Sequence, residues 1–173
     1  VKFFRIAAHE KGLNLSLRNI SLSTCGLVDG MDRLAGEGLP VTLCISLHAP
    51  NDEIRKQIMP VANRYTIEDV IAAAKRYERS TGRRVVFEYT LVAGLNDSPA
   101  CAQELAQVTA GIRKHINLIP VNDARGKYKP PAMKQAEGFL NVLKRKNVSA
   151  TLRRTLGADI DGACGQLRSK TLI

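Results

Sequence analysis

Short apolar runs recur along the chain, and they predict a series of strands. Three of them, at 41–47, 84–92 and 115–121, are almost continuously apolar or β-branched, which is typical of strands covered on both faces. Two weaker candidates lie at 19–24 and 150–156. The pattern therefore predicts five strands.

Helical spacing of apolar residues fills the intervals between these strands. The predicted helices are 66–79, 98–108 and 131–146, and the opening residues 1–9 also have a helical pattern. Thr66 with Asp69 approximates a capping box, and Gly82 is placed to end that helix. Strands that alternate with helices imply right-handed crossovers and a parallel sheet, so we expect one α/β domain, open or curled toward a barrel.

Polar side chains stand where the predicted strands end. Ser23 ends the first strand, Ser46 and His48 end the second, and Asn122 follows the fourth. Ligands of parallel α/β sheets bind beyond the carboxyl ends of the strands, so these residues are expected on one rim and suit hydrogen bonding to a polar small molecule. Taken singly, each residue also has a local structural explanation. Ser23 and Ser46 could cap turns, Asn122 could close an Asx-turn, and His48 could be a structural histidine.

Glu88 is unusual because it interrupts an apolar strand, where an unpaired charge is costly. It is either a solvent-side residue of a strand with one exposed face or a carboxylate inside a barrel, and the pattern does not choose between them. The segment 122–131 is rich in Gly, Pro and Lys, and we expect it to be a functional loop.

Composition limits the partners. The net charge of +10 and the pI of about 9.8 favour a phosphate-rich partner or a generically positive surface. The longest apolar runs fall far short of the roughly 20 residues that cross a bilayer. None of the four cysteines is paired in a CxxC motif, so a structural metal is not expected, and we predict a reducing, cytoplasmic setting.

The segment 157–167, with sequence GADIDGACGQL, is the most distinctive feature of the chain. Its glycines and aspartates disfavour a helix or a packed strand, so Cys164 is expected on a flexible, accessible segment. A cysteine near Arg153 and Arg168 is a plausible reactive thiolate, although an incidental thiol at a frayed terminus fits the residues equally well.

Five strings, in this order and spacing, carry a resemblance to a known family. They are STCGLVDGMDRLA, VTLCISLHAPNDEIRKQIMPV, RRVVFEYTLVAGLNDS, HINLIPVN and LRRTLGADIDGACGQL. Together they resemble the C-terminal half of the radical S-adenosylmethionine (SAM) RNA methyltransferases of the RlmN/Cfr type, closer to RlmN. The resemblance implies the C-terminal portion of a partial (βα)₆ barrel at 1–156, followed by a cysteine-bearing tail at 157–173.

The resemblance also implies roles for particular residues. Cys164 matches the family's methyl-carrying cysteine, and the expected SAM-contacting residues are Ser23, Ser46, Leu47, His48 and Asn122. In the implied reaction one SAM methylates the thiol. A second SAM is then cleaved at a [4Fe-4S] cluster, and the activated methyl carbon adds to C2 of an adenine in 23S rRNA, and in tRNA. An electron donor such as flavodoxin or ferredoxin is implied as well.

The cluster motif CxxxCxxC, the resolving cysteine and a Gly-Glu-Pro stretch belong upstream of Val1 in the family, and none of them occurs in these 173 residues. We therefore expect no cluster ligands here and no activity from these residues alone. Two alternatives remain open: a Cfr-like enzyme that methylates C8, and a non-catalytic RNA- or ribosome-binding module. Asn122-Asp123-Ala124 replaces the family's usual Asn-Pro, so the loop after the fourth strand is expected to differ in shape.

Overall fold

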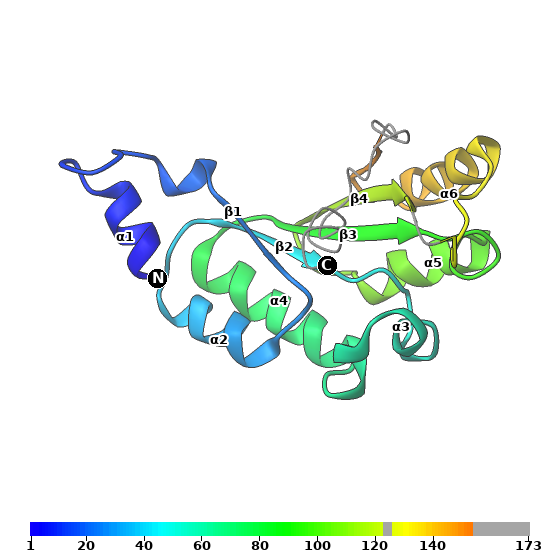
Figure 1. The fold of residues 1–173 in the computed structure, drawn as a ribbon, viewed down its shortest axis with the longest axis horizontal. Coiled ribbons are helices and arrows are strands. Elements are labelled where there is room, and N and C mark those ends of the chain that lie inside the picture. Colours follow the sequence, from blue (N-terminus) through cyan, green and yellow to red (C-terminus); the bar gives the residue numbers. More distant parts are fainter. Residues whose placement is uncertain (123–125, 154–173) are drawn as a thin grey trace, which may run out of the picture.

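A single parallel sheet organises the protein. The computed structural model describes residues 1–122 and 126–153, and it contains five strands in the described part (Figure 1). They are β1 (Ser21–Thr24), β2 (Thr42–Ser46), β3 (Val85–Leu91), β4 (Lys114–Pro120) and β5 (Ala150–Leu152). Each strand pairs in parallel with the next along the chain, so the spatial order is β1-β2-β3-β4-β5. The predicted parallel α/β fold is confirmed.

Helices connect the strands. They are α1 (Lys2–Ala8), α2 (Val28–Gly36), α3 (Asp52–Ile58), α4 (Ile67–Thr81), α5 (Pro99–Val108) and α6 (Met133–Arg145), with 3₁₀ turns at Leu17–Asn19 and Pro60–Asn63. The four helices predicted from the pattern are confirmed, whereas α2 and α3 were not predicted. None of the helices that the structure describes is long and apolar enough to cross a membrane.

Local capping explains where the long helices begin and end. Thr66 and Asp69 form the predicted capping box of α4, and Gly82 ends that helix in the left-handed region at φ 64°. The Ser98 side chain accepts a hydrogen bond from the backbone N–H of Cys101 at the start of α5, with Pro99 in the first turn.

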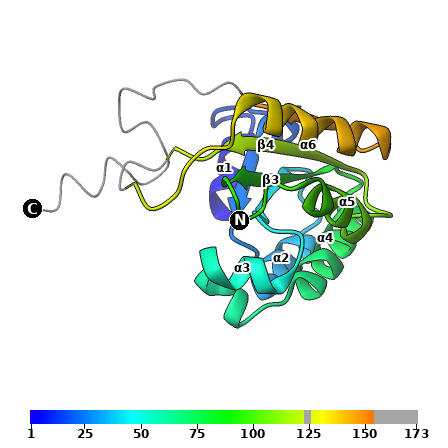
Figure 2. The same cartoon turned by 90° about the vertical axis from the view of Figure 1, so that its right-hand side faces the viewer.

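The two faces of the sheet differ in composition. One face carries the fully buried side chains of residues such as Ile45, Phe87 and Leu118, which pack in one hydrophobic core with α4, α5 and α6. Figure 2 shows α2, α4, α5 and α6 in an arc around this outer side of the sheet. The alternate residues point to the opposite, open face, which includes Cys44, Glu88 and other polar side chains.

Candidate functional site

The open face becomes polar toward the carboxyl ends of the strands. The sheet register places Ser23 beside Cys44, and Ser46 beside Glu88, which in turn lies beside Asn117. Ser23 and Ser46 therefore share one face, as the rim prediction requires. Neither hydroxyl has a hydrogen-bond partner in residues 1–122 and 126–153, so both are available to a ligand.

His48, just beyond β2, is held in a strained conformation. Its φ of 60° lies in the left-handed region, which is uncommon for residues other than glycine, although histidine adopts it more often than most. The backbone N–H groups of Leu47 and His48 both donate to the carbonyl of Glu88, at 3.0 and 3.2 Å. The carbonyl of His48 accepts from Asn96 Nδ2 at 2.8 Å. The turn is thus fixed by the neighbouring strand and by the loop that follows it.

The imidazole of His48 has a defined tautomer. Its Nδ1 accepts a hydrogen bond from the backbone N–H of Thr90 at 3.0 Å, so the ring proton of the neutral form is on Nε2. Burial, and secondarily the positive charge of Arg55, lower the pKa of His48 from 6.5 to about 4. Near neutral pH the ring is therefore an uncharged donor through Nε2–H.

Asn96 joins the end of β3 to the turn after β2. This side chain is fully buried, and its Nδ2 donates to the carbonyls of His48 and Thr90, each at 2.8 Å. Its Oδ1 accepts from the backbone N–H of Val92, and its own carbonyl accepts from the Tyr89 hydroxyl. Every polar group of the amide has a partner, as burial demands. Asn96 consequently fixes the spacing between the two strand ends.

Arg55 performs the same task between β1 and β2. It lies on α3 and is fully buried, yet no carboxylate forms an ion pair with it in the described part of the chain. Its guanidinium donates instead to three carbonyls: those of Cys25 at 2.8 Å, Tyr65 at 3.2 Å and Leu47 at 3.3 Å. The rigid fork of Arg suits this task, because one side chain can bind several acceptors at once.

Gly26 makes room for that guanidinium. A Cβ atom at this position would lie 2.9 Å from Nη2 of Arg55 and 3.0 Å from Cγ2 of Val70. The φ of 94° at Gly26 would also be strained in any other residue. The STCG sequence at the end of β1 thus serves the packing of Arg55 as much as it presents Ser23.

Glu88 lies in the middle of the sheet on the open face, half-buried beside Ser46 and Asn117. Its carboxylate has no ion pair or side-chain hydrogen bond within the described residues. Burial first, and the charge of Glu88 second, raise the pKa of the Cys44 thiol, while a hydrogen bond with Ser21 acts in the opposite direction. Glu88 therefore places a local negative charge beside Ser46 and Cys44 on the open face.

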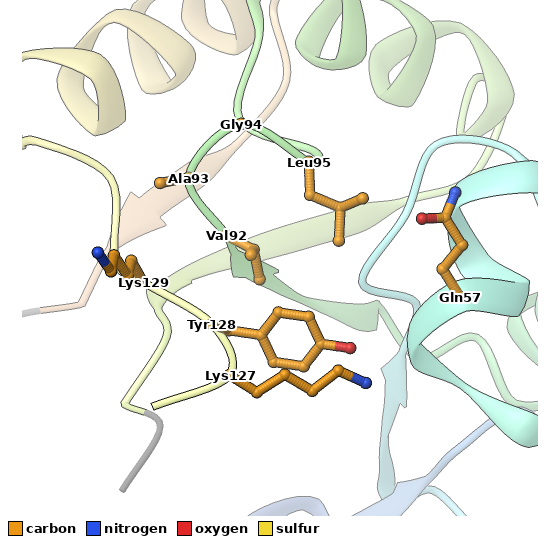
Figure 3. Close-up of a pocket in the computed structure, with 8 residues that line it drawn as sticks. All are labelled: Gln57, Val92, Ala93, Gly94, Leu95, Lys127, Tyr128 and Lys129. Atoms are coloured by element: carbon orange, nitrogen blue, oxygen red, sulfur yellow. The ribbon is translucent and has the colours of Figure 1, made fainter. Parts of the chain in front are cut away.

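A second feature of the rim is a cavity of about 460 Å³ beyond the end of β3. Its walls come from α3, from the loop after β3 and from the loop after β4, and the residues are Gln57, Val92, Ala93, Gly94, Leu95, Lys127, Tyr128 and Lys129 (Figure 3). The predicted functional loop 122–131 thus contributes three of the lining side chains. None of the five predicted SAM-contacting residues lines this cavity.

The predicted site residues fare unequally. The sheet brings Ser23, Ser46, Leu47 and His48 to one rim, although the Leu47 side chain is fully buried on the helix-covered side and both of its backbone polar groups are bonded within the protein. Asn122 follows β4 on the same rim, since the preceding N–H of Val121 donates to the carbonyl of Leu91. Cys164 and the segment 157–173 lie outside the described residues.

Two polar residues of the rim, Arg55 and Asn96, were missed from the sequence. The signal for Asn96 was available, because an Asn four residues after a strand in a Gly-containing turn often bonds to nearby backbone. Arg55 gave no such signal. Among the described residues no group of three His, Cys, Asp or Glu side chains could hold a metal ion.

Comparison with known proteins finds similar sequences and similar structures. No family model matches the chain. It is 48% identical over 171 residues to a protein of Lachnospira eligens described as "Probable dual-specificity RNA methyltransferase RlmN", with 98% of this chain and 49% of the relative aligned. A protein of Lachnoclostridium phytofermentans with the same description is 50% identical, over 97% of this chain and 48% of its own length. The chain spans about half the length of the curated relatives it matches.

The solved structures agree with the sequence relatives. A radical SAM methyltransferase from Sphaerobacter thermophilus aligns with a TM-score of 0.90 and 44% identity, over 95% of this chain and 49% of that protein. A domain of the pyruvate-formate lyase-activating enzyme from Bacteroides vulgatus shares the fold alone, with a TM-score of 0.55 at 15% identity, over 79% of this chain and all of that domain. By sequence and by fold the chain therefore matches about half of an RlmN-type radical SAM methyltransferase.

Proposed function

We propose that this chain is the SAM-binding and methyl-carrying half of an RlmN-type RNA methyltransferase. One observation carries the proposal: among the described residues, groups that can bind a ligand and have no protein partner are gathered on the open face and rim, next to Arg55 and Asn96, whose side-chain polar groups are bound within the protein. The hydroxyls of Ser23 and Ser46 and the Nε2–H of His48 are such groups. Asn122 lies on the same rim, directly after β4.

The donors and acceptors of the open face fit SAM. The cofactor has ribose hydroxyls, an α-amino group, a carboxylate and a positively charged sulfonium. Serine hydroxyls and a neutral imidazole N–H can bind the oxygens of such a ligand. The negative potential of Glu88 favours its cationic groups. Among the residues of this chain, Ser23, Ser46 and His48 bind and orient the cofactor, and Arg55 and Asn96 hold them in place without touching it.

Cys164 is the proposed methyl carrier. Its thiolate attacks the methyl carbon of one SAM, so that an S–CH₃ bond forms at the cysteine and S-adenosylhomocysteine leaves. A [4Fe-4S] cluster with a second SAM would supply the radical chemistry that activates this methyl group. Because the 173 residues contain no CxxxCxxC motif, we propose that they are inactive by themselves. The domain division at residue 156 is part of the same proposal.

The proposed substrate is C2 of an adenine in 23S rRNA, and in tRNA, in the cytoplasm, with flavodoxin or ferredoxin as electron donor. The relatives are described as dual-specificity RNA methyltransferases, which supports two RNA classes, and the net charge of +10 suits a polyanionic partner. A C8 enzyme of the Cfr type and a non-catalytic RNA-binding module are the alternatives that the test must distinguish.

The test is a peptide mass analysis of the full-length protein, expressed with iron and SAM available. We expect one added methylene on the Cys164 peptide, no addition in a Cys164→Ala variant, and 2-methyladenine in RNA treated with the wild type. 8-Methyladenine would establish the Cfr-type alternative. An unmodified Cys164 in a cluster-loaded protein that still binds RNA would favour the binding module.

A further inference from the structure

The cavity beyond β3 is lined by residues that are not part of the proposed cofactor site. Val92 and Leu95 form an apolar side, and Val92 is almost completely buried. The Lys127 and Tyr128 side chains extend side by side across the cavity toward Gln57 of α3 (Figure 3). Lys127 Nζ lies 5.0 Å from the centre of the Tyr128 ring, a cation–π contact. The cavity thus combines an aromatic ring, a cation, an amide and an apolar wall.

The loops that build the cavity are tied to each other. The backbone N–H of Ala93 donates to the carbonyl of Lys129 at 2.8 Å, which joins the loop after β3 to the loop after β4. The N–H of Gly94 donates to Asp97 Oδ1 at 3.0 Å, within the first of these loops. These bonds hold the apolar wall and the Lys127–Tyr128 pair in a fixed relation, so the binding surface is preorganised.

The charge of the cavity discriminates between ligands. Two of its eight lining residues are lysines, and none is an aspartate or glutamate. SAM has no phosphate and a net positive charge, so this cavity is unfavourable for it, unlike the open face near Glu88. A nucleotide of an RNA strand has a base that can stack on an aromatic ring and a phosphate that a lysine can bind.

We propose that this cavity is a subsite for an RNA nucleotide next to the reacting adenine, with a base against Tyr128 and the adjoining phosphate bound by Lys127. The inference rests on the proposed function, because it assumes an RNA substrate. It adds a position for that substrate: the nucleotide enters from the β3–β4 side of the rim, whereas the cofactor occupies the open face between β1 and β3. Gln57 can hydrogen-bond to the edge of the base.

The experiment measures binding of an oligoadenylate and, separately, of SAM to the full-length protein over a series of salt concentrations. We expect Tyr128→Leu to weaken oligoadenylate binding by about 5- to 150-fold, the range for one stacked base, and Tyr128→Phe to retain most of the affinity. Lys127→Gln should reduce the slope of log affinity against log salt by about 1. SAM affinity should not change in any of these variants.

Lys146→Gln is the matched control. Lys146 is an exposed lysine that follows α6, at the opposite end of the sheet from the rim. This variant should keep the oligoadenylate affinity much closer to the wild type. Equal losses in Lys127→Gln and Lys146→Gln would overturn the subsite, because general charge would then explain binding. Loss of SAM affinity in Tyr128→Leu would also overturn it, by assigning the cavity to the cofactor.

The subsite and the proposed function fail in different ways. If the wild type binds oligoadenylate and all the cavity variants bind it equally well, the subsite is wrong and the proposed function is untouched. If the wild type binds SAM but no RNA at low salt, the proposed RNA substrate is wrong and the subsite is overturned with it. A Cys164 that takes up a methyl group in the Tyr128→Leu variant would show that the cofactor half of the site is intact.

Discussion

Two regions near the rim both contain polar side chains, but they differ in whether these side chains are hydrogen-bonded to the protein. In the closed corner, formed by Arg55 and Asn96 with the carbonyls they hold, the side chains are fully buried and bound to protein. On the open face, Ser23, Ser46 and Glu88 are half-buried or exposed and have no side-chain partner in the described residues. The closed corner fixes the ends of the strands, and the open face is left for a ligand.

The difference separates stability from binding. Removing a buried donor leaves acceptors without partners and costs stability, whereas removing an unpartnered hydroxyl costs little until a ligand is bound. Each of the following substitutions is designed to break or sharpen this distinction.

Arg55→Leu should have the largest effect. Three carbonyls, of which those of Leu47 and Tyr65 are buried, would lose their donor. We expect a loss of about 3 to 5 kcal/mol in the free energy of unfolding. Denaturant unfolding measures it. Arg64→Ala is the control, because Arg64 is exposed and its ion pair with Asp29 at 2.9 Å lies on the surface, where such pairs contribute little. Similar losses in the two variants would contradict the role of the closed corner.

His48 should make stability depend on pH. Its folded pKa of about 4 lies below the ordinary value of 6.5, so the unfolded chain binds more protons between these values. The stabilisation of the folded state that comes from the neutral His48 ring is fully present above pH 6.5. It is lost as the pH falls toward 4, and the free energy of unfolding then decreases by roughly 3 kcal/mol at most. Unfolding at pH 5 and at pH 6.5 should differ less in His48→Gln than in the wild type.

His115 provides the comparison for that measurement. Burial, and then the charge of Arg84, lower its pKa as well, although Asn117 opposes the shift. The His115 ring lies farther from the rim, and its nitrogens are near the hydroxyls of Ser149 and Thr151. The His115→Gln variant should therefore keep most of the pH dependence of unfolding that the wild type shows. An unchanged pH dependence in His48→Gln would show that His48 does not have the lowered pKa on which this prediction rests.

Ser46→Ala should separate binding from stability. We expect SAM affinity to fall about tenfold, as for the loss of one hydrogen bond, with a change in unfolding free energy within about 0.5 kcal/mol. Ser98→Ala is the converse control: its hydroxyl caps α5, so it should lose about 1 kcal/mol of stability and keep the SAM affinity. Calorimetric titration and denaturant unfolding measure the two quantities, and a stable Ser46→Ala protein with full SAM affinity would argue against the assignment.

Glu88→Gln should produce the smallest effect, on the neighbouring thiol. Removing the carboxylate charge lowers the pKa of Cys44, but burial, which is the larger cause, keeps it raised. Alkylation of Cys44 near pH 8 should become faster, because a larger fraction of the thiol is then ionised. Ser21→Ala should act in the opposite direction, and no change in either variant would contradict the coupling.

Much of the fold could be predicted because the strands that organise it are continuous apolar runs. The residues of β2, β3 and β4 are recognisable without neighbours, and so are the caps at Thr66 and Ser98. The helices α2 and α3 could not be found in this way. α2 buries only a short stripe that includes Met31 and Leu34, and α3 buries a single residue, which is an arginine.

The candidate site could likewise be predicted only in part. Residues that end strands, such as Ser46 and His48, could be predicted to share a rim because parallel strands end at one edge. The burial of Arg55 could not be predicted, because its acceptors are backbone carbonyls from three separate segments of the chain. Every residue has such a carbonyl, so the sequence does not indicate which ones will accept. The position of Lys127 and Tyr128 depends likewise on how two loops meet.

The strand order has a consequence for how the protein is made. Because the spatial order β1-β2-β3-β4-β5 is also the chain order, each strand that emerges during synthesis finds its partner already present. No strand pair in the described sheet requires a segment that is made later to insert between two earlier ones. Contacts between successive units close shorter loops than contacts between distant strands, which favours fast folding. We therefore expect the described strands to add to the sheet in chain order, one βα unit at a time, while the chain is still being translated.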